Sequence, residues 1–460
     1  MSGDPTQIGL RPDQLKKDTE TCIVYGRDWT RVHAPSAKAV AFPESTADVQ
    51  RIVQWAMANR MWLVPSGGRT GLAGGAVASR GELVVSMDRM NQILELNAYD
   101  RFVRCQAGVV TEALQNHVRD AGFYFPVDFA SRGSSHIGGN IATNAGGVNV
   151  VRYGMIREWV LSLEVVTGAG QILKLNRDLI KNNAGLDLRH LFVGSEGILG
   201  FITEASLRIT NPPKEPQVLL LGIMDLSQSI EVLKRFQSAL SVTAFEFFTD
   251  KALQYVLRAA PELAAPFKNS TSFYLLIEFE KDSDAAVDRA LDEFEKLQGA
   301  GIVSEGALSQ NETQFKSFWS YRERISESLS SYRPFKADIS VRVSKVPEFI
   351  RQAEEELERI SSTLEVVWFG HIGDGNLHIN LLPQGTGQSA EEFKKECDRS
   401  SEPLFNLLAS FEGSVSAEHG IGLLKKSLLP LSRSIEEIEI MRKLKEVFDP
   451  EGIMNPGKVL

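Results

Sequence analysis

The pattern of apolar and polar residues switches repeatedly along the chain between short apolar runs, which are typical of buried strands, and the 3.6-residue spacing of amphipathic helices. Short apolar runs predict buried strands at residues 39–42, 62–64, 82–85, 102–105, 161–166, 172–175, 200–203 and 206–209. Segments 45–59 and 111–121 carry apolar side chains at helical spacing, and Ser45 is placed to cap the first of them. This part of the chain therefore predicts strands alternating with amphipathic helices, preceded by an N-terminal arm at residues 1–35.

Three prolines at residues 211–216 predict a domain boundary, because proline removes backbone donors and ends regular structure. Beyond them the pattern starts again, with strands expected at 218–223, 245–248 and 273–280 and helices at 227–240, 285–297 and 434–448. We expect three parts: a first domain at 1–213, a second at 214–415, and a C-terminal segment at 416–460. The second domain has the alternation of an α+β fold.

Size and charge narrow the class of protein. A chain of 460 residues is too long for one core. The net charge of −9 offers no basic stripe, which argues against a nucleic-acid partner. Three widely spaced cysteines fit a reducing compartment and predict no disulfide framework. With no export signal and no apolar run of membrane-spanning length, we expect a cytoplasmic protein, while peripheral membrane association stays open.

Two glycine-rich runs carry the first chemical signal, at residues 133–147 and at residues 65–72 with Gly74 and Gly75. Small residues leave backbone N–H groups able to surround a phosphate, so two such runs predict a large ligand with two phosphates. Neither run has the spacing of a Rossmann or P-loop motif. The alternative is a pair of mobile surface loops.

Three of the seven histidines stand in glycine-bracketed motifs. His371 and His378 flank a turn signal, Gly373-Asp374-Gly375, between two apolar runs, so a chain reversal could bring both imidazoles together. His419 follows Glu418 in a third such motif. Two imidazoles and a carboxylate with an open position are the ligands of a catalytic divalent metal. The alternative is that these histidines satisfy buried hydrogen bonds.

Fixed positive charge for an anionic ligand is expected near residues 315–330. Arg322 and Ser326 are four residues apart in a predicted helix and so share a face, and Lys336 follows. Arginine offers a carboxylate a planar fork, and lysine a point charge. The alternative is a solvated helix face.

The glycine runs, with Arg152-Tyr153-Gly154 and the run at 194–200, resemble the FAD-linked D-2-hydroxy-acid dehydrogenases of the vanillyl-alcohol-oxidase superfamily over nearly all of the chain. The resemblance implies an α+β fold: a two-part FAD-binding domain, an α+β substrate or cap domain, and a C-terminal helical segment that returns to the flavin. FAD contacts are then expected from Pro65, Ser66, Gly67, Gly68, Arg69, Thr70, Gly71, Gly133, Ser134, His136, Ile137, Gly138, Gly139, Asn140, Thr143, Asn144, Gly146, Gly147, Tyr153, Gly154, Glu196, Gly197, Gly200, Ile202 and Asn455.

The same resemblance implies a divalent metal, expected to be Zn²⁺, held by His371, His378 and Glu418. It implies substrate contacts from Arg322, Ser326, Lys336, Asn380 and His419. The metal would lower the pKa of the substrate hydroxyl, His419 would accept its proton, and a hydride would pass from C2 to the flavin N5. The alternative for His419 is that it orients a metal ligand.

The substrate implied is a small anionic 2-hydroxy acid. The form of the run at 133–140 is closest to the branch that oxidises D-2-hydroxyglutarate to 2-oxoglutarate, with D-lactate and D-malate as alternatives. Arg342, where many relatives have proline, could bind the far carboxylate of a diacid or lie on the surface.

The implied electron acceptor is an electron-transfer flavoprotein or a quinone rather than NAD. A second hypothesis for the function is a flavin subunit that works inside a glycolate-oxidase-type complex. A third is a non-enzymatic protein, in which the glycine runs are loops and the histidines are core residues. The oligomeric state stays open, a homodimer included.

Overall fold

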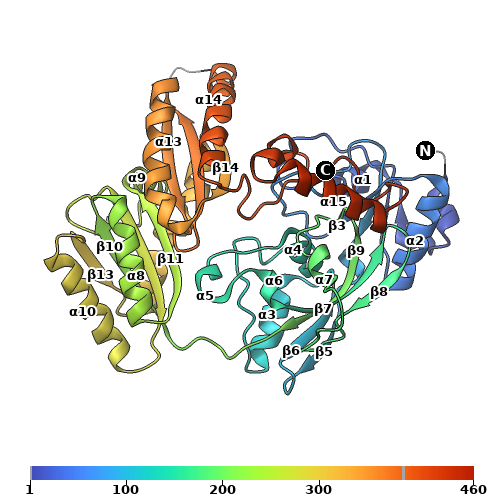
Figure 1. The fold of residues 1–460 in the computed structure, drawn as a ribbon, viewed down its shortest axis with the longest axis horizontal. Helices are drawn as coiled ribbons and strands as arrows, with labels where there is room; N and C mark the ends of the chain where they lie inside the picture. Colours follow the sequence, from blue (N-terminus) through green and yellow to red (C-terminus); the bar gives the residue numbers. More distant parts are fainter. Residues whose placement is uncertain (1–2, 386–388) are drawn as a thin grey trace. The chain divides into compact units, whose positions relative to one another are not determined.

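The computed structural model describes residues 3–385 and 389–460. The chain forms two compact units (Figure 1). Unit 1 comprises the chain up to Gly147, then Gly154–Pro212 and Glu418–Leu460, and unit 2 comprises Val148–Tyr153 and Pro213–Ala417. The division between Pro212 and Pro213 lies inside the proline-rich segment. The segment Val148–Tyr153 belongs to unit 2, although we expected it within the first domain.

One sheet of unit 1 has the order β1-β2-β4-β3, formed by β1 (Leu15–Lys16), β2 (Ala39–Ala41), β4 (Leu83–Ser86) and β3 (Leu63–Ser66). The last three strands are parallel, and α2 (Thr46–Asn59) connects β2 to β3. The Ser45 hydroxyl accepts a hydrogen bond from Asp48 N, so the predicted cap is confirmed. The N-terminal residues are more than an arm, because α1 (Thr19–Tyr25) forms there and β1 pairs with β2.

The second sheet of unit 1 is antiparallel, in the order β5 (Ile93–Asn97), β6 (Phe102–Gln106), β9 (Gly200–Arg208), β7 (Val160–Thr167) and β8 (Ile172–Leu175). The two strands expected at 200–203 and 206–209 are one strand, β9, because its residues pair without a break with β6 from Glu204 to Arg208. Both sheets contribute to one apolar core that includes Val85, Val103 and Val165. The helices of this region are α3 (Thr111–Asp120), α4 (Ile137–Thr143), α6 (Ile156–Trp159) and α7 (Arg189–Phe192).

The C-terminal segment closes the open edge of the parallel sheet. After α15 (Ile435–Phe448) the chain runs beside β3, where Leu63 N donates to Ile453 O at 2.8 Å and Asn455 N donates to Leu63 O at 2.8 Å. Asp449, 2% exposed, accepts hydrogen bonds from Ile453 N, Met454 N and Lys445 Nζ. Figure 1 shows this red segment among the blue elements of unit 1.

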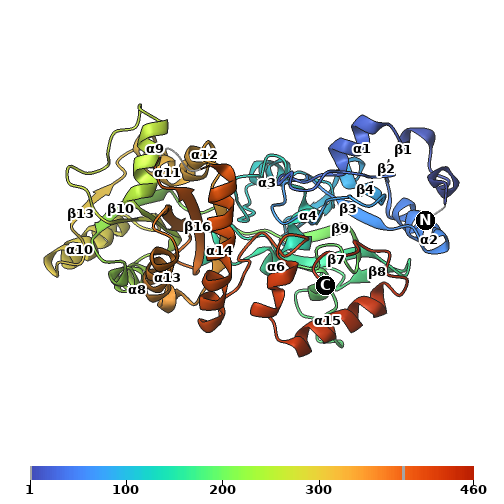
Figure 2. The same cartoon turned by 90° about the horizontal axis from the view of Figure 1, so that it is seen from above.

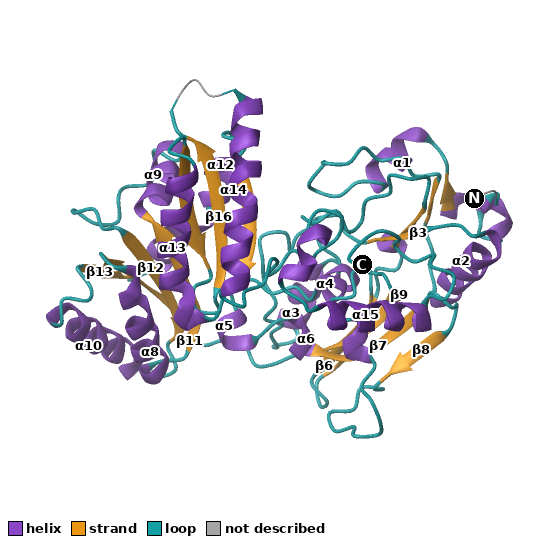
Figure 3. Cartoon of the chain, turned by 45° about the horizontal axis from the view of Figure 1, so that its top comes forward, coloured by secondary structure: helices purple, strands orange, loops and turns teal. Residues whose placement is uncertain are grey.

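Unit 2 is built on one seven-stranded antiparallel sheet, drawn in orange in Figure 3. Its order is β13 (Glu305–Leu308), β10 (Pro216–Ile223), β12 (Phe273–Glu280), β11 (Val242–Thr249), β15 (Leu364–Gly370), β16 (Asn376–Pro383) and β14 (Phe335–Ser340). The strands predicted at 218–223, 245–248 and 273–280 are therefore confirmed as β10, β11 and β12.

Helices cover both faces of this sheet. Figure 2 shows α9 (Asp250–Ala259), α11 (Glu312–Glu323) and α12 (Ile325–Ser330) on one side and α8 (Ser229–Ala239) and α13 (Val346–Ile360) on the other. Two further helices are α10 (Ala285–Gly299) and α14 (Ala390–Ser410), and the short α5 (Val150–Tyr153) packs on β11. The single helix expected around 315–330 is wrong, because the chain is interrupted at Arg324 and forms α11 and α12 instead.

No helix within residues 3–385 and 389–460 combines the length and the apolar character needed to cross a membrane.

We predict that Asp449→Ala lowers the free energy of unfolding by about 3 kcal/mol, because it leaves the Lys445 ammonium partly buried without its carboxylate. The measurement is chemical denaturation followed by circular dichroism. Glu446→Ala is the control, since Glu446 is exposed on the same helix, and it should change stability by less than about 0.5 kcal/mol. Equal stability of the two variants would contradict a clamping role for Asp449.

Candidate functional site

Both glycine-rich runs border one partly open cavity in unit 1. The first run leaves the end of the parallel strand β3, and the second contains α4. A concave site lined by backbone, apolar side chains and a few polar groups suits a small molecule or cofactor. The predicted FAD contacts that line it are Pro65, Ser66, Gly67, Gly68, Arg69, Thr70, Gly71, His136, Gly138, Gly139, Asn140, Thr143, Glu196, Gly197, Gly200 and Ile202.

Two glycines show why the runs lack side chains. A Cβ on Gly68 would lie 2.0 Å from Ser134 O, so the two runs pack backbone against backbone. A Cβ on Gly139 would meet no atom within 4 Å, because Gly139 faces the open cavity. Glycine therefore lets the two runs pack closely and also leaves their backbone accessible to a ligand.

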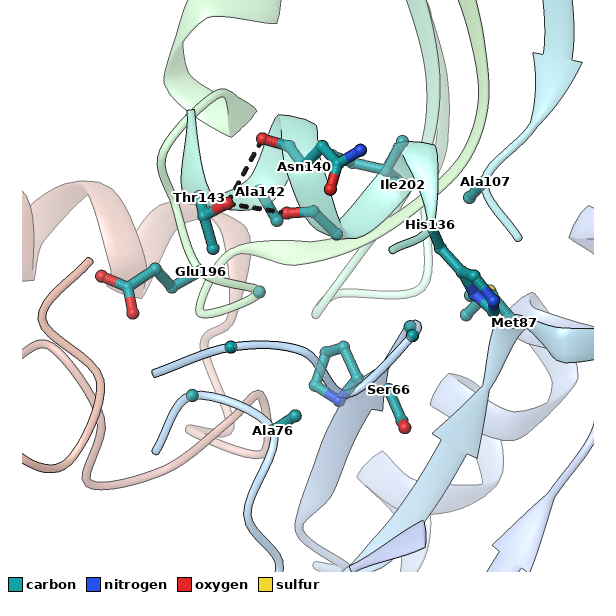
Figure 4. Close-up of a pocket in the computed structure, with 18 of the residues that line it drawn as sticks. Ser66, Ala76, Met87, Ala107, His136, Asn140, Ala142, Thr143, Glu196 and Ile202 are labelled. Atoms are coloured by element: carbon teal, nitrogen blue, oxygen red, sulfur yellow. Dashed lines mark hydrogen bonds between the residues drawn. The ribbon is translucent and has the colours of Figure 1, made fainter. Parts of the chain in front are cut away.

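Polar groups around the cavity differ in whether the protein already satisfies them. Asn140 Nδ2 donates to Thr111 Oγ1 at 2.6 Å, and Thr143 Oγ1 donates to Gly139 O at 3.1 Å (Figure 4). In contrast, Ser66 Oγ and His136 Nδ1 are buried and have no hydrogen-bond partner within residues 3–385 and 389–460. Burial lowers the pKa of His136, which favours its neutral form. These two atoms fit a ligand that supplies the missing hydrogen bonds.

Glu196 fastens the segment that carries His419 to the cavity. Its carboxylate accepts hydrogen bonds from Ile421 N at 2.7 Å and Gly422 N at 2.8 Å. Burial raises the pKa of Glu196, and the two backbone donors oppose that shift. Asn455 Nδ2 also donates to Glu196 O at 2.8 Å, so the C-terminal tail reaches the same segment. His419 lines the cavity, which its motif alone did not indicate.

Several predicted FAD contacts do not line the cavity. Ile137 belongs to the apolar core, Gly147 is needed because a Cβ would lie 2.0 Å from Asp128 O, and Tyr153 lies in unit 2, where its hydroxyl donates to Glu280 at 3.1 Å. The others away from the lining are Gly133, Ser134, Asn144, Gly146, Gly154 and Asn455. Their contacts to FAD stay predictions.

Some residues of the lining are not among the predicted FAD contacts. Gly75, Ala142 and Ser195 lie inside the runs that the sequence indicated, and the residues outside them are Ala73, Ala76, Met87, Ala107 and Phe201. Met87 directly follows the parallel strand β4, and the ends of parallel strands meet at one sheet edge, which was an available signal. The alanines have no comparable signal, because small apolar residues are common throughout any core.

A second group of predicted site residues gathers on the sheet of unit 2. Strand register places Lys336 opposite Asn380, Asp338 opposite His378, and Ser340 opposite Asn376. Cross-strand partners share a face, so these residues form a polar ladder on β14 and β16. Phe369 on β15 also pairs with His378, and Phe369 packs in the core below α9, α11 and α12. The ladder therefore lies on the face that these helices cover.

The predicted chain reversal between the two histidines is confirmed. Gly375 has a positive φ of 86° in the turn between β15 and β16, and the rings of His371 and His378 lie 5.6 Å apart. A carboxylate lies beside Nδ1 of each ring: Glu246 Oε1 at 2.7 Å from His371 and Asp338 Oδ1 at 3.8 Å from His378. Metal-binding histidines are commonly held by a hydrogen bond to a carboxylate, as His371 is here, whereas Asp338 is close to His378 but beyond hydrogen-bond distance.

The predicted anion-binding residues are in different environments. Arg322 is buried, its Nε lies 2.8 Å from Glu246 Oε2, and its guanidinium lies over the Phe369 ring at 4.8 Å. Ser326 is exposed on α12 and shares no helix face with Arg322, contrary to expectation. The side chain of Lys336 reaches solvent, yet surrounding protein atoms desolvate its ammonium and lower its pKa.

Asn380 is the most informative member of the ladder. It is 1% exposed, and neither its Nδ2 nor its Oδ1 has a hydrogen-bond partner within the described residues. Buried amide groups are nearly always satisfied, so this side chain fits an additional polar ligand.

The remaining predicted residues lie at the unit boundary or on the surface. Glu418 and His419 begin the last segment of unit 1, directly after Ala417 of unit 2. The metal ligand set of His371, His378 and Glu418 therefore stays a prediction. Arg342 is exposed and forms an ion pair with Glu412, which favours the surface alternative for this arginine.

We predict that Gly139→Val greatly weakens FAD binding while leaving the fold intact, because a Cβ at this position meets no protein atom within 4 Å and the side chain extends into the cavity. The expected effect is at least a tenfold loss of affinity, measured by flavin fluorescence during reconstitution of the apoprotein. Gly299→Val is the control, since a Cβ there also meets no atom and Gly299 is remote from the cavity lining. Unchanged flavin affinity in Gly139→Val would place FAD elsewhere.

Comparisons with known proteins agree with this geometry. The chain matches the FAD binding domain over residues 37–176 and the C-terminal domain of FAD linked oxidases over residues 212–459. It is 49% identical to a D-2-hydroxyglutarate dehydrogenase of Stutzerimonas stutzeri, over 99% of this chain and 98% of the relative. It is 36% identical to the mitochondrial D-2-hydroxyglutarate dehydrogenase of Bos taurus, over 98% of this chain and 81% of the relative.

Solved structures show the same fold at low identity. The 4-ethylphenol oxidase of Gulosibacter chungangensis matches with a TM-score of 0.73 at 18% identity, covering 97% of this chain and 94% of that one. A p-cresol methylhydroxylase matches with a TM-score of 0.75 at 13% identity and the same coverage. These matches confirm the expected α+β architecture. The chain belongs to the FAD-linked D-2-hydroxyacid dehydrogenase family, with an FAD-binding domain of the vanillyl-alcohol-oxidase type.

Proposed function

We propose that this flavoprotein oxidises D-2-hydroxyglutarate to 2-oxoglutarate with the help of a divalent metal. The observation that carries the proposal is the polar face of unit 2. There the unsatisfied Asn380 shares a sheet face with His378, whose ring lies 5.6 Å from that of His371, and His371 is hydrogen-bonded to Glu246. The relatives at 49% and 36% identity, which are named for this substrate, support it.

His371 and His378 suit a divalent metal such as Zn²⁺, because imidazole is a ligand that zinc accepts and Glu246 orients the ring of His371. Glu418 is proposed as the third ligand. Ser414 N donates to Ser340 O at 2.8 Å on β14, and Glu418 follows four residues later, so the chain can span only about 14 Å between them. A metal bound there would polarise the substrate hydroxyl and lower its pKa.

Substrate binding is proposed to depend on Arg322, Lys336, Asn380 and Ser326. Arg322 and Lys336 supply positive charge for carboxylates, the Asn380 amide supplies a donor and an acceptor, and the exposed Ser326 supplies a hydroxyl. His419 accepts the proton of the 2-hydroxyl as general base. Bound FAD would supply the acceptor for the hydride that leaves C2, and an electron-transfer flavoprotein or a quinone is proposed as the final electron acceptor.

A substrate panel tests the proposal. Under anaerobic conditions D-2-hydroxyglutarate should bleach the flavin absorbance of the holoenzyme, and pretreatment with a chelator should slow the bleaching at least a hundredfold, because the hydroxyl loses its polarising metal. Zn²⁺ or another divalent cation should restore the rate. Faster bleaching by D-lactate or D-malate would reassign the substrate, and full activity after metal removal would exclude the metal from the reaction.

Arg322→Lys should lower kcat/KM for D-2-hydroxyglutarate by about 10- to 100-fold, because lysine keeps the charge beside Glu246 but loses the planar fork. Steady-state kinetics with a dye acceptor measure it. Arg324→Lys is the matched control: Arg324 lies two residues away and pairs with Glu262 on the surface, so its kinetics should stay within twofold. A wild-type kcat/KM in Arg322→Lys would show that the fork is not used.

A further inference from the structure

Glu246 links two parts of the proposed site that the sequence gives no reason to connect. It lies on β11, is 0% exposed, and uses one carboxylate oxygen for each partner. Oε1 lies 2.7 Å from His371 Nδ1, just beyond β15, and Oε2 lies 2.8 Å from Arg322 Nε on α11. One buried carboxylate therefore touches both a proposed metal ligand and the proposed substrate arginine.

We propose that Glu246 is a positioning residue that couples the metal-binding histidine to the substrate-binding arginine. This inference rests on the proposed function and adds to it a residue that acts through His371 and Arg322.

The surroundings of Glu246 argue against a purely structural role. Every residue of β11 is buried, and its neighbours on the same strand face, Ala244 and Phe248, belong to the apolar core. A buried ion pair is seldom more stable than well-packed apolar residues of similar volume, so stability alone gives little reason for a carboxylate here. Both of its oxygens face residues of the proposed site.

The contact with His371 sets which ring nitrogen carries the proton. A carboxylate accepts a hydrogen from Nδ1, which leaves the lone pair of the neutral ring on Nε2, the atom that a metal requires. Glu246 therefore holds the ring in both the tautomer and the orientation needed for ligation.

The contact with Arg322 selects one edge of the guanidinium. Glu246 lies beside Nε of Arg322, and the Phe369 ring lies against the flat face of the guanidinium. The edge formed by the two terminal nitrogens is therefore the one that a substrate carboxylate can approach. Moving Glu246 would therefore disturb the metal ligand and the carboxylate-binding edge together.

Glu246→Gln tests whether Glu246 must hold His371 and Arg322 at the same time. A carboxylate offers two acceptor oxygens to two donors, whereas an amide offers one acceptor and one donor, so glutamine can satisfy His371 or Arg322 but not both. The matched control is Glu365→Gln on β15, which makes the same change at a carboxylate that accepts a hydrogen bond from Tyr255 at 2.7 Å.

The experiment uses the FAD-loaded enzyme and measures two quantities: the Kd for Zn²⁺ by competition with a chromophoric chelator, and the KM for D-2-hydroxyglutarate at saturating Zn²⁺. Glu246→Gln should raise the Kd about 10- to 100-fold and should also raise KM about tenfold. Glu365→Gln should leave both the Kd for Zn²⁺ and the KM within twofold of wild type, because Glu365 pairs with Tyr255 and not with His371 or Arg322. When Glu246→Gln is added to Arg322→Lys, KM should stay close to that of Arg322→Lys alone, because the guanidinium that Glu246 positions is already absent.

A wild-type Kd and KM in Glu246→Gln would overturn the proposal, as would additive effects on KM in the double variant. If Glu246→Gln fails to fold, Glu246→Asp gives the same comparison, because it keeps the charge but is too short to reach both partners. Wild-type Kd and KM values in Glu246→Asp would likewise overturn it. A wild-type enzyme that binds Zn²⁺ but oxidises no D-2-hydroxy acid would instead refute the proposed function.

Discussion

The register between β14 and β16 is the constraint on which the chemistry of unit 2 depends. Each residue of one strand faces a fixed partner on the other, so Lys336, Asp338 and Ser340 all point to the same face as Asn380, His378 and Asn376. A slip of β14 by one residue would turn Lys336, Asp338 and Ser340 to the opposite face, away from their partners on β16. The apolar residues between them, such as Ala337 and Ile379, hold the register because they are buried on the other side.

In unit 1 the constraint is different, because backbone must be exposed at the cavity while the fold stays stable. Its two glycine runs approach so closely that Gly68 admits no side chain, and the groups left unsatisfied at the cavity are few. Stability comes from elsewhere: a core shared by two sheets, and Asp449 with Lys445 holding the C-terminal tail. The glycine runs can thus present backbone to the cavity, while core residues such as Met87 and Phe201 supply its apolar lining.

The sequence was most informative where a local pattern has one physical meaning. The turn at Gly373-Asp374-Gly375 between two apolar runs predicted the hairpin that unites His371 and His378, and the glycine runs predicted the cavity. Glu246 was not predicted, because a lone carboxylate in an apolar strand belongs to no motif and its partners are distant in the chain. The interruption at Arg324 was also missed, since helical periodicity continues across it.

The pairing of residues 453–455 with β3 has a consequence for how the protein is made. Leu63 is synthesised early, yet its strand-edge partners leave the ribosome almost 400 residues later. Until then β3 is the open edge of a parallel sheet, able to pair with other extended chains. The nascent polypeptide must therefore carry this exposed strand until residues 453–455 have been made, and unit 1 completes its folding only then.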